Sequence, residues 1–284
     1  MKYGLILPNI GVYSDTRTLS DLARLAEEAG WDGVFLWDTL HYEAEEQAVC
    51  DPWIALAAIA MRTERIKIGT MVAALPRRRP WKLARETITL DQLSHGRFIL
   101  GVGAGDGNDH GFTHFGEEGD ARKRAKLLDE SLAILQGLWS GQPFSYSGEH
   151  YHIKEITFLP PPVQMPRIPI WIAGIWPRKG PLSRAARLDG INPMTKRDDG
   201  TFGALTPAEI HQLKRFMDEH RTTPTPFDIV TTGGVFDAVQ DEQARAMLRA
   251  HAAAGTTWCL EGIWPQRDFD GVRASIQQGP PQLE

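Results

Sequence analysis

Side chains able to donate or accept protons stand at the ends of several short apolar segments. Asp38 and His41 follow GVFLW (33–37), Asp106 follows FILGVG (98–103), and Glu261 lies near the end of TTWCLEG (256–262). Carboxylates and imidazoles are common general acids and bases, but only when the fold brings them to one reacting group. The first question is therefore which elements carry these segment ends.

A glycine-rich stretch, GVGAGDGN (101–108), is the most conspicuous candidate for a binding loop. It lacks the dinucleotide fingerprint, because Asp106 stands where a third glycine is needed. It is not a phosphate loop either, because no Gly-Lys-Ser/Thr follows. Its glycines would allow the backbone to approach a flat ligand closely, with a flexible loop as the alternative interpretation.

Basic residues suggest two places for an anion. GIWPRKGPLS (174–183) joins a predicted strand to a helix start, where free N–H groups with Arg178 and Lys179 would favour a phosphate. PRRRPW (76–81) could attract an anionic ligand. For both segments the alternative is an exposed or ion-paired basic surface.

Two other chemistries find little support in the sequence. His110 and His114 could share a helix face, but they lie in a glycine-rich segment without the histidines of metallohydrolase barrels, so we expect no catalytic metal. The sequence contains no G-x-S-x-G motif of the kind that carries the nucleophile of a serine hydrolase.

Apolar segments alternate with amphipathic ones about eight times along the chain, which predicts parallel strands connected by helices. Eight units in 284 residues favour a single α/β domain, 1–284, folded as a (β/α)8 TIM barrel, with its active site at the carboxyl ends of the strands. The predicted strands are 3–8, 33–37, 66–72, 98–103, 168–174, 190–194, 228–233 and 256–262. The predicted helices are 18–29, 80–93, 120–139, 181–188, 242–253 and 269–277, with two more that begin at 52 and 206.

Particular residues indicate where some of these elements begin. Thr18 with Asp21, and Thr206 with Glu209, resemble capping boxes.

Residues 140–167 interrupt the alternation between the fourth helix and the fifth strand. They predict a short hairpin insertion, which is either a surface excursion or a wall over the barrel mouth.

Composition excludes several classes of protein. The chain is 42% hydrophobic and 24% charged, with a net charge of −5, which indicates a globular protein that does not bind nucleic acid. Two cysteines rule out a disulfide framework. No signal peptide or membrane-spanning run is visible, so we expect a cytoplasmic protein without a membrane partner.

The strand-end residues resemble the bacterial luciferase-like family of FMN- or coenzyme F420-dependent oxidoreductases. The matching pieces are GLILP, GWDGVFLWD, RIKIGTMVAALPRRRPWKLARETITLDQLSHGRFILGVGAG and FLPPPVQMPRIPIWIAG, and the resemblance covers nearly the whole chain. It implies a flavoprotein or F420-dependent monooxygenase or other oxidoreductase that acts on a small organic substrate. It also implies a cis peptide at Met71-Val72, supporting the cofactor ring.

The resemblance also implies site residues. Asp38, His41, Asp106 and Glu261 would be catalytic, although Thr39 stands where the family usually has histidine. The implied cofactor-binding residues are Pro8, Asn9, Thr70, Met71, Val72, Gly103, Gly105, Ala173, Gly174, Arg178, Lys179 and Gly180.

Partners and a lid follow from the same resemblance. A monooxygenase of this kind would take reduced FMN from a separate flavin reductase. A homodimer would form through the helix at 81–93, unless Leu83, Ile88, Leu90 and Leu93 simply pack on the barrel. The family's mobile lid would be shortened to RDDGTFGAL (197–205), which predicts an open site.

Two other functions remain open. One is a flavin-binding barrel without catalytic activity, for which the altered Asp38-Thr39 pair is the best support. The other is a barrel hydrolase or isomerase for a phosphorylated small molecule, with Asp38 and Glu261 as acid and base.

Overall fold

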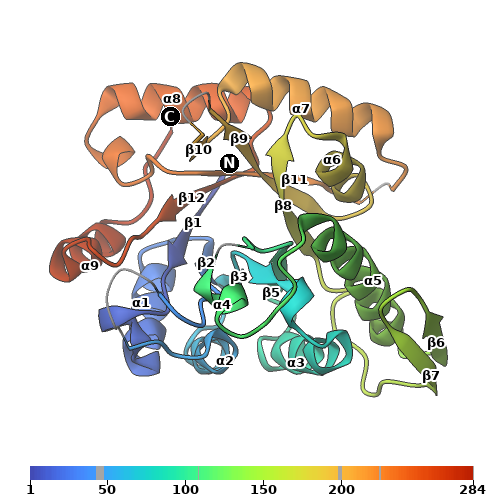
Figure 1. Ribbon diagram of the computed structural model, residues 1–284. Helices are drawn as coiled ribbons and strands as arrows, with labels where there is room; N and C mark the ends of the chain where they lie inside the picture. The colour runs from blue at the N-terminus through green and yellow to red at the C-terminus, as the bar shows by residue number, and fades with distance from the viewer. Residues whose placement is uncertain (43–47, 108, 198–199, 224, 284) are drawn as a thin grey trace.

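The computed structural model describes residues 1–42, 48–107, 109–197, 200–223 and 225–283. Within them, parallel strands close into a barrel of eight and helices surround it (Figure 1). Parallel pairing of the first and last of these strands, and of the fourth and fifth, closes the ring. The barrel strands are β1 (Lys2–Leu7), β2 (Gly33–Leu36), β3 (Lys67–Thr70), β5 (Phe98–Gly103), β8 (Ile170–Trp176), β9 (Gly190–Lys196), β11 (Asp228–Thr232) and β12 (Trp258–Gly262).

The outer layer consists of helices that alternate with these strands, so the predicted (β/α)8 barrel is confirmed. Its helices are α1 (Thr16–Glu28), α2 (Pro52–Arg62), α3 (Pro80–Leu93), α5 (Ala121–Trp139), α6 (Lys179–Ala185), α7 (Pro207–His220), α8 (Glu242–Ala254) and α9 (Phe269–Gln278). The shorter elements are η1 (Gly11–Ser14), β4 (Ala73–Ala74), η2 (Leu75–Arg77), α4 (His110–Thr113), β10 (Phe202–Gly203) and η3 (Asp237–Val239). In the described part of the chain, no helix is both long enough and apolar enough to span a membrane.

Helix starts follow local capping chemistry. Thr206 and Glu209 form the predicted capping box at α7, each side chain bonding to the other residue's backbone N–H. The capping box predicted for Thr18 and Asp21 is wrong. Asp15 caps α1 instead by accepting the N–H groups of residues 17 and 18, because the helix begins two residues before Thr18.

The predicted insertion is a hairpin of β6 (Phe144–Ser147) and β7 (His152–Ile156), which lies outside α5 (Figure 1). The Glu130 carboxylate on α5 accepts the backbone N–H groups of residues 149, 150 and 151 and so fastens the hairpin turn to the helix. The insertion is therefore a surface excursion and does not form a wall over the mouth.

The third barrel strand is interrupted, although the sequence predicts one strand over 66–72. β3 ends at Thr70, and β4 resumes pairing with β5 at Ala73, so two residues lie between the strands. The bond between them, Met71-Val72, is a cis peptide, as the family resemblance predicts. A Cβ atom on Gly101 of β5 would lie 2.0 Å from the Thr70 carbonyl oxygen, so the two strands approach this closely only because residue 101 is glycine.

The barrel interior is a separate apolar cluster from the layer between strands and helices. It contains Ile6, Phe35, Met71, Ile99, Trp171, Val230, Trp258 and Leu260. Since successive side chains on a strand point to opposite faces, every second residue from these positions faces the interior, and the intervening residues face the helices. This alternation decides which strand-end side chains can reach the mouth.

Candidate functional site

Inward-facing residues at the carboxyl ends of the strands define the barrel mouth. Trp37, two residues after Phe35, packs on the interior cluster and meets the ring of Trp264 at 5.3 Å between centroids. Asn192 on β9 donates to the Val230 carbonyl at 3.1 Å and to Thr232 Oγ1 at 3.4 Å. We use "the mouth" for the inward-facing residues Trp37, Met71, Val72, Asn192, Thr232 and Trp264.

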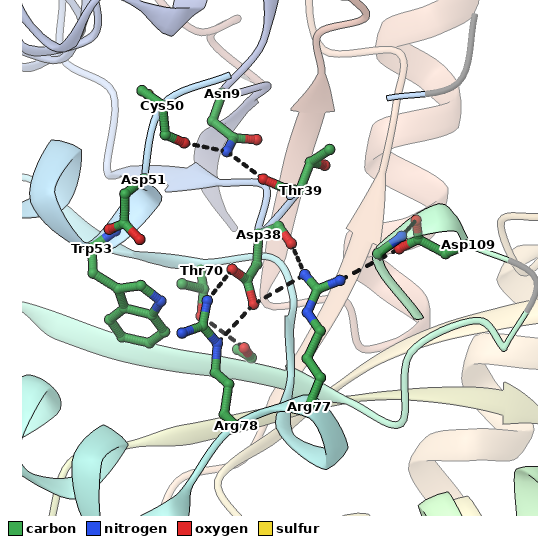
Figure 2. Close-up of polar contacts among 12 residues, drawn as sticks. Asn9, Asp38, Thr39, Cys50, Asp51, Trp53, Thr70, Arg77, Arg78 and Asp109 are labelled. Atoms are coloured by element: carbon green, nitrogen blue, oxygen red, sulfur yellow. Dashed lines mark hydrogen bonds and ion pairs between the residues drawn. The ribbon is translucent and has the colours of Figure 1, made fainter. Parts of the chain in front are cut away.

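Asp38 lies at the end of β2 but faces away from the mouth. Its side chain is fully buried, and Arg78 binds both carboxylate oxygens, with Nε 3.0 Å from Oδ2 (Figure 2). Arg77 lies 3.5 Å from Oδ2 and also donates to the Asp38 carbonyl. With both oxygens held by guanidinium groups, Asp38 acts in this geometry as an ion-paired anchor. Two of the three arginines of PRRRPW are accordingly ion-paired rather than open to an anionic ligand.

Arg77 connects this anchor to the loop after β5. Its second nitrogen lies 3.5 Å from Asp109 Oδ2, and Asp109 in turn caps α4 by accepting the Gly111 N–H at 2.8 Å (Figure 2). The guanidinium of Arg77 also stacks 5.5 Å above the ring of Phe112. The ends of β2 and β5 are thus joined through one arginine. The sequence does not predict the short helix α4.

Glu261 also faces the helix layer, because Leu260 and Gly262 on either side face inward. Its buried carboxylate accepts the N–H groups of Val235 at 2.9 Å and Phe236 at 3.3 Å, and Arg267 donates to it at 2.9 Å. Glu261 therefore holds the segment after β11 in place. Neither oxygen is presented to the mouth.

His41 is exposed and lies among other imidazoles. Its ring centroid is 5.4 Å from that of His110 and 6.1 Å from that of His114, and these two are 4.0 Å apart. Asp106 is exposed in the same loop region, after β5. Among the described residues, no three His, Cys, Asp or Glu side chains are grouped as metal ligands.

Asn9 ties the end of β1 to two neighbouring segments. It is fully buried, and its Nδ2 donates to the carbonyls of Thr39 at 2.9 Å and Cys50 at 2.7 Å (Figure 2). Its Oδ1 is buried and has no hydrogen-bond partner within the described part of the chain. That oxygen is a free acceptor beside the buried Pro8.

Three of the predicted cofactor-binding residues come together from three different strands. A Cβ atom on Gly103 would lie 3.0 Å from Val72 Cγ2 and 3.7 Å from Ala173 Cβ. These three residues form one small apolar wall at the inward side of the strand ends. Thr70, by contrast, uses its hydroxyl to donate to the Gly101 carbonyl at 2.7 Å.

Other predicted binding residues lie elsewhere. A Cβ atom on Gly105 would lie 2.4 Å from the ring of Phe112, so packing within the protein accounts for that glycine. Gly174 faces the helix layer, where an added Cβ atom would lie 3.1 Å from Pro181 Cβ. Arg178, Lys179 and Gly180 are exposed at the start of α6.

Sequence reasoning did not place Trp37, Asn192, Thr232 and Trp264 among the site residues. A usable signal was present. Counting in steps of two from the aromatic Phe35 and Trp258 leads directly to Trp37 and Trp264, whereas acidic character favoured the outward positions Asp38 and Glu261.

A separate cavity of about 210 Å³ lies behind the end of β11, lined by His251, Cys259 and Thr231 among others. Burial raises the pKa of the Cys259 thiol to about 11 and lowers the pKa of His251 below its usual value. His251 Nδ1 is buried and unpartnered among the described atoms. The neutral imidazole is therefore the form that this cavity favours.

We expect His251 to make stability depend on pH. The unfolded chain, with an ordinary histidine pKa of about 6.5, binds this proton more readily than the native state. Stability is therefore fully present above about pH 6.5 and is lost as the pH falls through the lowered native pKa. Melting temperatures of the wild type and His251→Gln between pH 8 and 5 should show a smaller decline in the variant. Parallel curves would contradict this assignment.

Comparisons with known proteins agree on the fold. An F420-dependent secondary alcohol dehydrogenase, solved with an F420–acetone adduct, superimposes with a TM-score of 0.75, covering 97% of this chain and 96% of that one at 17% identity. At this identity the similarity establishes the fold alone.

Two curated relatives match part of the sequence. An F420-dependent glucose-6-phosphate dehydrogenase from Microbacterium testaceum is 36% identical over 163 residues, which is 56% of this chain and 47% of that protein. The oxygenase component of a flavin-dependent trigonelline monooxygenase from Acinetobacter baylyi is 27% identical over 153 residues, covering 54% and 41%. The chain thus matches about half the length of these relatives.

The family is established by a match along nearly the entire chain. The sequence profile of the luciferase-like monooxygenases covers residues 2–279. The closed barrel and the cis peptide at Met71-Val72 agree with that match. The chain belongs to the luciferase-like monooxygenase family.

Proposed function

We propose that this protein is an oxidoreductase that uses FMN or coenzyme F420 at the mouth to oxidise or reduce a small organic substrate. The observation that carries the proposal is the wall formed by Val72, Gly103 and Ala173, which is apolar and lacks any side chain at residue 103. The family match supports it, since matched relatives include both F420-dependent dehydrogenases and flavin-dependent monooxygenases.

The residues present fit such a cofactor. A flat conjugated ring needs a smooth apolar surface and a few fixed polar groups, and Val72, Gly103 and Ala173 supply the surface. The buried Oδ1 of Asn9 is available as an acceptor for a ring N–H. Arg178 and Lys179, exposed at the start of α6, would attract the cofactor's phosphate.

The chain's own contribution would be binding, orientation and proton transfer. The cofactor supplies the two-electron redox chemistry when it is bound. Asp38 and Glu261 are held in ion pairs that face the helix layer, so we assign proton transfer to His41 with its neighbours His110 and His114, and to Asp106. In this proposal Thr39 contributes its backbone carbonyl to Asn9, and His41 takes the place of the family's usual histidine.

The two alternative functions differ in their support. A barrel hydrolase or isomerase would need Asp38 and Glu261 as free acid and base, and both carboxylates already hold arginines. A non-catalytic flavin-binding barrel would bind the same cofactor without turnover. Turnover assays of the loaded protein separate it from the proposed enzyme.

We propose two protein partners. The name of the trigonelline relative, an oxygenase component, supports a separate reductase if FMN is the cofactor. A homodimer would not use Leu83, Ile88 and Leu90, which are buried against the chain's own core. It would instead cover exposed apolar side chains on α2 and on the connector over α3, namely Ile54, Met61, Leu159, Val163 and Met165.

Cofactor binding is the experiment that tests the function. We expect FMN or F420 fluorescence to be quenched on titration with the purified protein, and Ala173→Leu to weaken that binding at least about tenfold by filling the space beside Gly103. Ala253→Leu, on the exposed face of α8, is the matched control. Analytical sedimentation of the same sample measures the oligomeric state and so tests the proposed homodimer. Absence of binding by either cofactor would refute the proposed function.

A further inference from the structure

Large apolar side chains are exposed around the same end of the barrel as the mouth. They follow the carboxyl ends of different strands, where a solvated loop would ordinarily carry polar residues. We call them the apolar rim: Leu40 after β2, Phe115 after α4, Met194 on β9, Phe202 on β10 and Trp264 after β12.

Apolar contacts connect the rim to the barrel interior through Trp264. Trp264, which is 57% exposed, contacts Trp37 below it, and Trp37 packs on the interior cluster with Val72. The polar groups facing this wall, Asn192 and Thr232, bond to each other. A ligand entering here therefore meets mainly carbon surface. Exposed large apolar side chains at the mouth of a barrel are typical of a ligand-binding site.

Several arginines at this end of the barrel are already paired with carboxylates. Arg77 and Arg78 pair with Asp38, and Arg77 also with Asp109. Arg267 pairs with Glu261. A phosphorylated substrate would need guanidinium or ammonium groups that are not already bound to carboxylates.

Two further cationic residues lie at the end of β9 and directly after it. Lys196 and Arg197 precede Asp198 and Asp199, so this segment carries no net charge. Arg178 and Lys179 are assigned above to the cofactor. The ion pairs of Asp38, Asp109 and Glu261 therefore leave fewer cations in the described part of the chain for a second anionic group at the mouth.

We propose that the substrate of this protein is an uncharged, predominantly apolar organic molecule, and that the apolar rim binds it. This inference rests on the proposed function for the position of the cofactor. It departs from the phosphorylated sugar named for the Microbacterium testaceum relative. The imidazoles of His41 and His114, which follow β2 and β5 at the same end of the barrel, could hydrogen-bond to a single carbonyl or hydroxyl oxygen of this substrate.

Calorimetric titration tests the substrate class with three probes. 4-Phenyl-2-butanone is neutral, 3-phenylpropanoate has nearly the same shape with a carboxylate in place of the methyl ketone, and glucose 6-phosphate represents the alternative. Each probe is titrated into the protein alone and into the protein loaded with FMN or F420. We expect the ketone to bind at least about tenfold more tightly than either anion.

Variants locate the binding. Trp264→Ser should weaken ketone binding about tenfold, in the range typical of removing a contacting tryptophan. Ile156→Ser, at a 45% exposed apolar residue on β7 of the hairpin outside α5, should leave ketone binding unchanged. Sedimentation of Trp264→Ser should match the wild type, because the rim binds a small molecule and is not a subunit interface.

The outcomes distinguish failure of this substrate proposal from failure of the proposed redox function. Four results would each overturn the proposal of an apolar substrate. Two concern the probes: tighter binding of glucose 6-phosphate or 3-phenylpropanoate than of the ketone, or no detectable ketone binding. The other two concern Trp264→Ser: unchanged ketone binding, or a changed oligomeric state. If neither cofactor binds while the ketone binds through Trp264, the proposed redox function fails and the apolar preference stands.

Discussion

Asp38→Asn is expected to lower the free energy of unfolding by about 3–5 kcal/mol, the usual result of removing one partner from a buried ion pair. The substitution preserves the side chain's size but removes the charge that Arg77 and Arg78 share. Two guanidinium groups would remain beside one amide, one of them almost fully buried. Urea unfolding monitored by circular dichroism measures the loss.

The control for this variant is a carboxylate at the surface. Asp21→Asn removes the partner of Arg62 from an ion pair in which both side chains are more than half exposed, and should change stability by less than about 1 kcal/mol. If Asp38→Asn abolished turnover while leaving stability at the wild-type value, Asp38 would have to be restored as a catalytic residue.

Gly101→Ala is expected to cost more than about 4 kcal/mol, or to prevent folding. The added Cβ would lie 2.0 Å from the carbonyl oxygen of Thr70, and backbone atoms cannot move aside as the end of a flexible side chain can. The β3–β5 contact would have to open, displacing the Met71 and Val72 side of the mouth. The soluble yield and melting temperature measure the effect.

A glycine without such contacts provides the comparison. A Cβ atom on Gly119 would have no atom within 4 Å, so Gly119→Ala should change stability by no more than about 0.5 kcal/mol. Cofactor binding by any Gly101→Ala protein that folds should also be weakened. A soluble Gly101→Ala protein with wild-type stability would show that β3 and β5 can separate without cost.

Most of the fold could be predicted from the sequence because its signals are local. Apolar runs of strand length, Pro at the first turn of α2, α3 and α7, and the Thr206 capping box all act within a few residues. The interruption of β3 could not be found in this way, since KIGTMV reads as one continuous apolar strand. What separates Thr70 from Ala73 is the approach of Gly101, a residue about thirty positions away.

The candidate site was predicted less completely, for a physical reason. Asp38 and Glu261 stand at the correct end of their strands, but side-chain direction alternates, and both fall on the outward positions. Their partners, Arg78 and Val235, come from other units of the barrel. Residue type therefore suggested acid–base chemistry where the tertiary structure placed ion pairs and caps. Trp37 and Trp264 carry no such chemical signature.

The alternation at the strand ends also has a consequence for how this sequence can change in evolution. Inward positions such as Asn192, Thr232 and Trp264 line the mouth, whereas the neighbouring outward positions pack against the helices of the barrel. Mutational libraries confined to the inward set should thus yield mostly folded proteins with altered substrate preference. Libraries at the outward set should yield mainly insoluble ones. Two adjacent codons, those of Trp37 and Asp38, would then evolve under different selective pressures.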